Sequence, residues 1–162
     1  MKKTQIIAIA LLSVAAAATF TCAGPLAQIF QTQPVSQEVQ WRTDLNAAHE
    51  ESILKNRPML IVFEADWCAY CKKMKGSTLS DNGVAGDVND NFIPVHLNLE
   101  DHSKIAEILE VNRIPCTIAL SPRADLLGRV VGYVDTVQYR ETLGRVRALQ
   151  ARVERQLAAQ TN

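Results

Sequence analysis

The stretch that decides the fold of this chain is residues 67–72, with the sequence WCAYCK. Its two cysteines, Cys68 and Cys71, can close a small disulfide or stand open as a dithiol. The apolar run 59–63 before them predicts a buried strand, and residues 72–75 after them predict the beginning of a helix. Cys68 is therefore expected near a helix N-terminus, where unpaired backbone N–H groups favour a thiolate over a thiol. This placement suits thiol–disulfide exchange.

The composition indicates one globular domain of ordinary size. The chain has 162 residues, of which 48% are hydrophobic and 21% are charged. A chain of this length can bury a useful core without structural disulfides. The formal net charge is zero, so nothing indicates a surface for nucleic acid.

Residues 1–23 have the layout of a secretory signal. Lys2 and Lys3 form a basic start, residues 6–20 form an apolar run of 15 residues, and the best cleavage position follows Ala23. The run is shorter than the roughly 20 residues that a membrane-spanning helix needs. We therefore expect residues 1–23 to be a signal peptide that is removed from the mature protein.

Two alternatives for this segment stay open at the level of sequence. The segment can be retained as a membrane anchor, or Cys22 can be lipidated, although residues 19–21 are a poor match to the small-residue box that precedes a lipidated cysteine. In each case the protein is expected to be exported to a periplasmic or other extracytoplasmic space. Such compartments are oxidising, and disulfides persist there. Contact with a membrane is expected only if the signal is retained.

The rest of the chain divides into three parts. Residues 24–40 are rich in glutamine and predict a linker, residues 41–150 predict the domain, and residues 151–162 predict a C-terminal helix extension. The expected elements of the domain, in chain order, are helix 44–56, strand 59–64, a helix after the cysteines, helix 81–91, strand 92–99, a short helix from about 103, strand 116–120, strand 126–134 and a closing helix from about 135. Thr43 or Asp44 is expected to cap the first of these helices, and Asp81 is expected to cap helix 81–91.

This order predicts an α/β fold with a four-stranded mixed sheet. The strand–helix–strand connections imply parallel neighbouring strands, whereas the close pair of strands around residues 121–125 implies an antiparallel hairpin. A sheet of this kind is covered by helices on both faces.

Three features of the sequence resemble the thioredoxin superfamily. They are the pattern Phe63-x-x-x-Trp67-Cys68-x-x-Cys71-Lys72 after a strand, the pair Ile114-Pro115 before a later strand, and Gly132 ahead of the closing helix. The resemblance covers residues 44–148 and is greatest to exported thioredoxin-like proteins. It implies a thioredoxin-like fold in which Pro115 is cis and lies against the two cysteines. The alternative is an ordinary trans proline at the start of a strand.

The sequence departs from the thioredoxin pattern near both cysteines. Thioredoxins have a buried aspartate where this chain has Val62, and that aspartate is thought to accept the proton of the second cysteine. Glu64 lies two residues further, on the same face of the strand, and could replace it; otherwise Glu64 is a partly solvated acid at a strand end. The dipeptide Ala69-Tyr70 replaces Gly-Pro, and Tyr70 could contact a substrate or cover the cysteines.

The resemblance implies a thiol–disulfide oxidoreductase that acts on disulfides of protein substrates, with reduction favoured over oxidation. Cys68 is the expected nucleophile, because it is nearer the helix N-terminus and is expected to lie uncovered there. Cys71 is the residue expected to resolve the mixed disulfide. Pro115 and Glu64 complete the expected catalytic set, and Trp67, Tyr70 and Ile114 are the expected substrate contacts. No cofactor is expected, but a separate electron donor or acceptor is needed.

Two other functions stay open. Cys116, next to Pro115, is expected to be a small buried strand residue, but together with Cys68 and Cys71 it could form a metal-binding or metal-delivery module. A fourth ligand is not evident, because His49, His96 and His102 stand at no telling spacing from the cysteines. The second possibility is a binding domain whose disulfide is purely structural.

Overall fold

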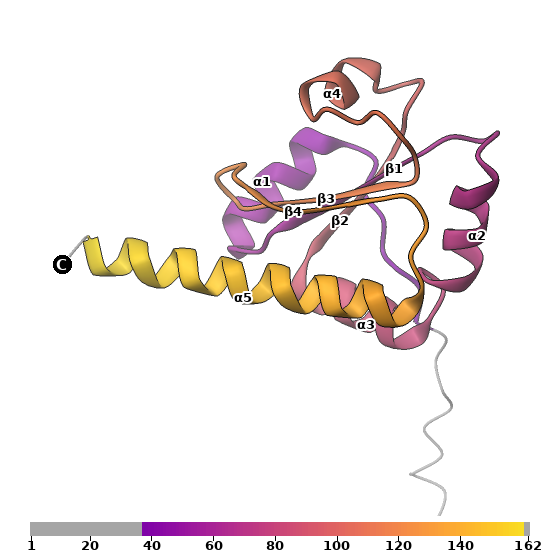
Figure 1. Cartoon of the computed structure of the whole chain (residues 1–162). Helices are drawn as coiled ribbons and strands as arrows, with labels where there is room; N and C mark the ends of the chain where they lie inside the picture. Colours follow the sequence, from indigo (N-terminus) through magenta and orange to yellow (C-terminus); the bar gives the residue numbers. More distant parts are fainter. Residues whose placement is uncertain (1–36, 161–162) are drawn as a thin grey trace, which may run out of the picture. The chain divides into compact units, whose positions relative to one another are not determined.

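The computed structural model describes residues 37–160 (Figure 1). The expected signal peptide and most of the expected linker lie outside the described residues. The elements in chain order are α1 (Leu45–Lys55), β1 (Met59–Glu64), α2 (Ala69–Ser77), α3 (Asn82–Asn91), β2 (Ile93–Asn98), α4 (Ser103–Ile108), β3 (Cys116–Leu120), β4 (Leu126–Val131) and α5 (Thr136–Gln160).

The strands form one sheet of four strands in the order β2-β1-β3-β4. β1 pairs with β2 in parallel and with β3 antiparallel, and β3 pairs antiparallel with β4. The turn between β3 and β4 is closed by Ser121, whose backbone N–H donates to the Asp125 carbonyl at 2.8 Å. The predicted mixed sheet with a hairpin is therefore confirmed.

Alternate residues of β1 serve two separate cores, one on each face of the sheet. One core packs the sheet against α2, α3 and α5, and it contains Leu60, Val62 and Tyr139. The other core packs the sheet against α1 and α4, and it contains Ile61 and Phe63. Figure 1 shows α3 and α5 on one side of the strands and α1 and α4 on the other. Burial on both faces explains why β1 is a continuous apolar run.

Two aspartates begin helices, as the sequence indicated. The side chain of Asp44 accepts from the backbone N–H groups of Asn46 and Ala47 at the start of α1. Asp81 accepts from the N–H of Val84 at the start of α3. Each carboxylate satisfies N–H groups that have no partner inside the helix.

The last strand is shorter than the sequence predicted. β4 ends at Val131, because Gly132 takes φ of +89°, a backbone conformation that favours glycine. The N–H of Gly132 donates to the Pro115 carbonyl at 2.8 Å, which turns the chain toward α5. At Gly128 an added Cβ would lie 2.9 Å from a methyl group of Val146, so the missing side chain lets α5 approach the strand closely.

The end of the expected linker lies against the domain. The backbone N–H groups of Gln37 and Gln40 donate to the side chains of Asn82 and Asn89 on α3. Arg42 then pairs with Val95 of β2 in an isolated parallel bridge. The polypeptide is therefore attached to the fold from the first described residues onward.

The closing helix includes the expected C-terminal extension. α5 continues without a break from Thr136 to Gln160, so the expected extension after residue 150 is a continuation of the same helix. No helix within residues 37–160 combines the length and apolarity needed to cross a membrane.

A cluster of charged side chains joins Arg42, which lies before α1, to Glu51 and Lys55 of α1. Arg42 donates twice to the Glu51 carboxylate, at 2.7 and 2.9 Å, and Lys55 donates to it at 2.7 Å. These bonds lower the pKa of Glu51 from 4.5 to about 2. The stabilisation is thus present above pH 4.5 and is lost as the pH falls toward 2. We expect Glu51→Gln to lower the free energy of unfolding by up to about 1 kcal/mol at pH 7.

Urea unfolding of both proteins between pH 7 and pH 2 tests this expectation. The difference between wild type and Glu51→Gln should shrink as the solution becomes more acidic. Glu50→Gln is the matched control, because Glu50 is an exposed neighbour on the same helix. A constant difference across the whole pH range would contradict the assigned role of the ion pair.

Candidate active site

The two cysteines of the deciding stretch form a disulfide at the start of α2. The Cys68–Cys71 bond joins sulfurs 2.09 Å apart, with the Cα atoms 5.3 Å apart. Cys68 is the N-cap residue of α2, and its sulfur accepts the backbone N–H of Cys71 at 3.1 Å. The helix N-terminus is therefore directed at the Cys68 sulfur, as the sequence predicted. In the reduced protein, such N–H groups stabilise a thiolate at this position.

Both cysteines are buried. Cys68 is 6% exposed and Cys71 is 3% exposed, so Cys68 is the more accessible of the two but is not the uncovered residue that we expected. Ala65 is buried beside them, and Ile114 packs against the same cluster. A substrate must therefore approach Cys68 closely across this small apolar surface.

Pro115 follows a cis peptide bond from Ile114, as the resemblance implied. Ile114 packs against the disulfide cluster, which brings the proline-led loop to the cysteines. The N–H and C=O of Ile114 have no hydrogen-bond partner among residues 37–160. An extended peptide can therefore pair with this backbone.

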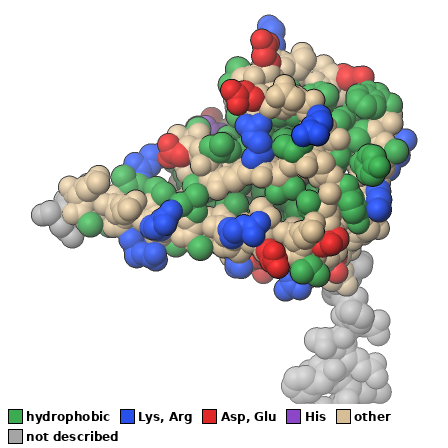
Figure 2. Space-filling model, viewed as in Figure 1, with side chains coloured by type: hydrophobic (Ala, Val, Ile, Leu, Met, Phe, Trp, Pro, Cys, Tyr) green, Lys and Arg blue, Asp and Glu red, His purple; other side chains and the backbone are tan. Residues whose placement is uncertain are grey.

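A groove of about 370 Å³ runs beside the disulfide. Its lining residues come from the start of α2, the Pro115 loop and the end of β4: Tyr70, Arg113, Ile114, Val131, Gly132 and Tyr133. Tyr70 is 65% exposed at the edge of the groove. In Figure 2 hydrophobic side chains gather at the α2 end of the molecule, with basic side chains beside them.

The expected substrate contacts do not all line this groove. Tyr70 and Ile114 do, whereas Trp67 is absent from its lining. Trp67 is nevertheless 66% exposed, and its ring N–H donates to Glu100 at 2.9 Å. Tyr133, which the sequence did not indicate as a site residue, also lines the groove, and the Lys73 ammonium lies 4.1 Å from the centroid of its ring. The sequence feature that could have indicated Tyr133 as a site residue is its position directly after Gly132.

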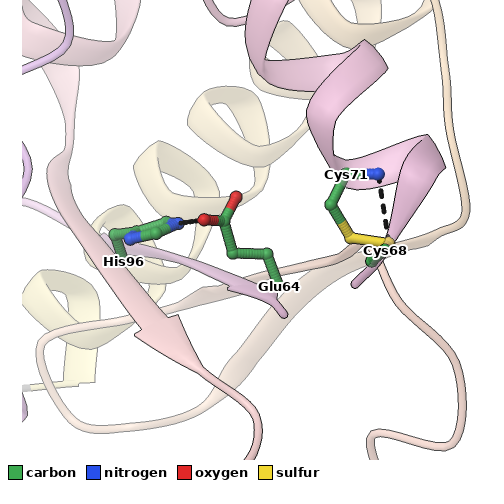
Figure 3. The surroundings of a disulfide bond; sticks show 4 residues. All are labelled: Glu64, Cys68, Cys71 and His96. Carbon is green, nitrogen blue, oxygen red and sulfur yellow. Dashed lines mark hydrogen bonds and ion pairs between the residues drawn. A yellow bond between two sulfur atoms is a disulfide. The ribbon is translucent and has the colours of Figure 1, made fainter. Parts of the chain in front are cut away.

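Glu64 stands at the end of β1 and is paired with a histidine of β2. A Glu64 carboxylate oxygen lies 2.8 Å from Nε2 of His96. Figure 3 shows Glu64 between His96 and the disulfide. His96 carried no sign of a role in the sequence, because only the pairing of β1 with β2 brings the two residues together.

Cys116 belongs to a different core cluster from the disulfide. It is buried in the core between the sheet and helices α1 and α4, where it pairs with Phe63 across the strands. Burial raises the pKa of its thiol, which keeps the sulfur protonated. Within residues 37–160, no three His, Cys, Asp or Glu residues are grouped so that they could hold a metal ion. The metal-module alternative therefore has no support in the described residues.

The other two histidines have structural partners. His49 has its Nε2 atom 3.0 Å from the Pro122 carbonyl, and His102 has its Nδ1 atom 3.1 Å from the Asn98 carbonyl.

A disulfide that caps a helix after the first central strand, together with a cis-proline loop against it, defines a domain of the thiol–disulfide oxidoreductase class. Comparison with known proteins agrees with this class. The family model described as thioredoxin-like domain matches residues 45–147. The chain belongs to this thioredoxin-like family.

Individual relatives give the same result. The thiol:disulfide interchange protein TxlA of Synechococcus elongatus is 31% identical over 86 residues, which are 52% of this chain and 44% of TxlA. A thioredoxin of Griffithsia pacifica is 32% identical over 95 residues, which are 59% of this chain and 84% of that thioredoxin. The chain thus spans less than half the length of TxlA.

The fold comparison extends over more of the chain. A solved structure described as DsbH oxidoreductase superposes with a TM-score of 0.63 at 17% identity, covering 74% of this chain and 92% of that one. At this identity the match concerns the fold alone.

Proposed function

We propose that this protein is an exported thiol–disulfide oxidoreductase that reduces disulfides in protein substrates. The observation that carries the proposal is the Cys68 sulfur at the N-terminus of α2, where it accepts the Cys71 N–H beside the Ile114–Pro115 loop. A thiolate stabilised there is both a nucleophile and a leaving group, which thiol–disulfide exchange requires.

The proposed reaction has two exchange steps. The Cys68 thiolate attacks one sulfur of a substrate disulfide, and the other substrate sulfur leaves as a thiolate. Cys71 then attacks the Cys68 sulfur of the mixed disulfide, which releases the second substrate thiolate and closes the Cys68–Cys71 bond. Two electrons pass to the substrate in each cycle, so a separate electron donor must reduce the protein again.

The surroundings of the disulfide support assigned roles for the other site residues. The unpaired backbone of Ile114 can hydrogen-bond an extended substrate segment, and the groove beside Tyr70 can hold one of its side chains. Trp67 extends the exposed apolar surface on which a substrate docks. Pro115 holds its loop against the cysteines and has no N–H to compete for the substrate backbone.

Glu64 is proposed as the base that accepts the proton of Cys71 in the second step. In Figure 3 its side chain lies on the His96 side of the disulfide, with the carboxylate turned toward His96. Cys71 is the more buried sulfur and needs such an acceptor, because burial in apolar surroundings disfavours a thiolate.

Export is supported by the sequence of residues 1–23, whose basic start and apolar run have the layout of a signal peptide. Reduction as the direction rests on Trp67, Ile114 and Lys72, which match reducing thioredoxins. The reduction potential of the Cys68–Cys71 pair decides the direction, since 30 mV corresponds to about 1.4 kcal/mol for two electrons.

The experiment that tests the function is trapping of the intermediate. We expect reduced Cys71→Ser protein to form a stable mixed disulfide with a disulfide-containing protein, because the second step then lacks its thiol. Wild-type protein should show no such adduct under the same conditions. Non-reducing electrophoresis and mass spectrometry identify the linked cysteine. Attachment through Cys116, or equal trapping by Cys68→Ser, would contradict the assigned roles.

A further inference from the structure

We propose that Arg113 selects the substrates of this protein: the groove beside the disulfide favours protein disulfides that have an acidic residue within two positions of the attacked cysteine. The proposal rests on the proposed function and names the substrate class of that same site. Arg113 is then a specificity-determining residue, which contacts the substrate but takes no part in the exchange of sulfur bonds.

The groove beside the disulfide is largely apolar and carries one cationic side chain. Its volume is about 370 Å³, and its lining includes the aromatic residues Tyr70 and Tyr133. Val131 adds apolar surface and is 44% exposed. Arg113 is the only charged residue among the described residues that line it. A site with apolar walls and one charged group favours a ligand that has an apolar part and a complementary charge.

The Arg113 side chain has no partner in the part of the chain that the structure describes. It is exposed, and it makes neither a hydrogen bond nor an ion pair with any of residues 37–160. Arg42, by contrast, is paired with the Glu51 carboxylate. A guanidinium is always charged and presents N–H donors in a planar fork that fits a carboxylate. Arg113 is therefore free to pair with a carboxylate of a bound segment.

A second cation lies at the wall of the groove that Tyr133 forms. The Lys73 ammonium is 4.1 Å from the centroid of the Tyr133 ring. On the other side of the cysteines, the Glu100 carboxylate is engaged with the ring N–H of Trp67. The groove therefore has a positive potential, which attracts anionic segments and repels cationic ones.

The position of Arg113 in the chain limits where the acidic residue of a substrate can stand. Arg113 is next to Ile114, which packs against the disulfide cluster and has an unpaired backbone that can bind an extended segment. An extended segment advances only about 3.3 Å per residue. A carboxylate that reaches Arg113 thus belongs to a residue close in sequence to the cysteine that Cys68 attacks.

Two simpler interpretations of Arg113 exist, and the position of the acid in the substrate separates them from the proposal. A merely solvated arginine gives no preference among substrates. A general attraction between a positive surface and an anionic chain depends on the net charge of the substrate and not on where the charge stands. A contact in the groove depends on the position of the charge, because only a residue near the attacked cysteine reaches Arg113.

The experiment measures how fast the reduced full chain attacks synthetic peptides, each with a single cysteine joined to a neutral thiopyridyl group by a disulfide. The Cys68 thiolate bonds to the peptide sulfur and the bond to the thiopyridyl sulfur breaks. The thiopyridyl sulfur leaves with that electron pair, takes a proton from water and is followed by absorbance as thiopyridone. A single glutamate is moved through the two positions on each side of the cysteine, or is placed at the far end of the peptide. Glutamine and lysine replace it in two reference series.

The variants are Arg113→Gln, Arg113→Glu and the matched control Arg123→Gln, with Cys68→Ser as the background. Arg123 is exposed in the turn after β3, whereas Arg113 precedes β3, so the control removes the same charge at the opposite end of that strand. The quantity compared is the ratio of the rate constants for the glutamate and glutamine peptides. A change in the reactivity of Cys68 itself cancels in this ratio.

With the wild type we expect the peptide with glutamate at its best position to react roughly five-fold faster than its glutamine counterpart, the upper end for an exposed ion pair. Arg113→Gln should lower this ratio to less than about two-fold. Arg113→Glu should make lysine the preferred residue at the same position, and Arg123→Gln should keep the wild-type ratio. Added salt should reduce the wild-type preference, because exposed charges are screened.

The outcomes distinguish the selection by Arg113 from the proposed function. Equal ratios for near and distant glutamate, or an unchanged ratio in Arg113→Gln, would overturn the contact in the groove while exchange through Cys68 stands. If the wild type releases thiopyridone no faster than Cys68→Ser with any peptide, the proposed exchange is itself wrong, and the role of Arg113 falls with it.

Discussion

Replacing Cys68 with serine should abolish catalysed reduction of protein disulfides. The substrate should then be reduced only at the slow rate at which the added reductant acts without the protein. A hydroxyl cannot form the mixed disulfide, so the first exchange step has no substitute. Neither remaining thiol offers another route, because Cys71 is the more buried member of the pair and Cys116 is enclosed in the core on the α1 side of the sheet. Turnover of a protein disulfide in the presence of a small dithiol measures the effect.

Cys116→Ala is the matched control for this variant. It removes a buried thiol without touching the disulfide cluster, and we expect it to retain turnover close to that of wild type. Turnover by Cys68→Ser above the background would show that Cys71 or Cys116 starts the reaction. Loss of turnover in a folded Cys116→Ala protein would show that the third thiol takes part in exchange, contrary to its position in the structure.

Tyr139→Ala should cause the largest loss of stability that a single substitution outside the active site produces. Tyr139 is fully buried between α5 and the sheet, in the core that also holds Leu60 and Val62. Truncating a buried aromatic side chain removes its contacts and leaves a cavity, which costs about 3–5 kcal/mol. Urea unfolding at neutral pH, followed by far-UV circular dichroism, measures the change.

Tyr139→Phe separates the ring from the hydroxyl. The hydroxyl lies 3.4 Å from Oγ1 of Thr117 and burial raises its pKa, so at neutral pH it is an uncharged partner in a long hydrogen bond. We expect Tyr139→Phe to cost about 1 kcal/mol or less. Equal destabilisation by the two variants would assign the stabilisation to the hydroxyl and contradict the packing argument.

The sequence predicted the elements that depend on neighbouring residues. The apolar run of β1, the caps at Asp44 and Asp81 and the hairpin at residues 121–125 each depend on a few adjacent side chains, and all are present in the structure. The chain itself also indicated that the cysteines stand where β1 leads to a helix.

The structure differs from the sequence-based expectation where a residue depends on distant parts of the chain. β4 was predicted to continue to residue 134, but the bond from Gly132 to Pro115 ends it at Val131. Cys68 was expected to be uncovered, but Ala65 and Ile114 enclose it. Nothing in the sequence indicates that His96 is the partner of Glu64.

By itself, therefore, the sequence determined the class of fold, the order of its strands and helices, and the placement of a dithiol at a helix N-terminus. Hydrophobic periodicity and capping act between residues within a few positions of one another, so they can be read along the chain. Only the tertiary structure decided how closely the sulfurs are covered, which residues line the groove and which histidine meets Glu64. Those contacts join residues far apart in the chain, and their geometry is set by strand register and by the packing of both cores.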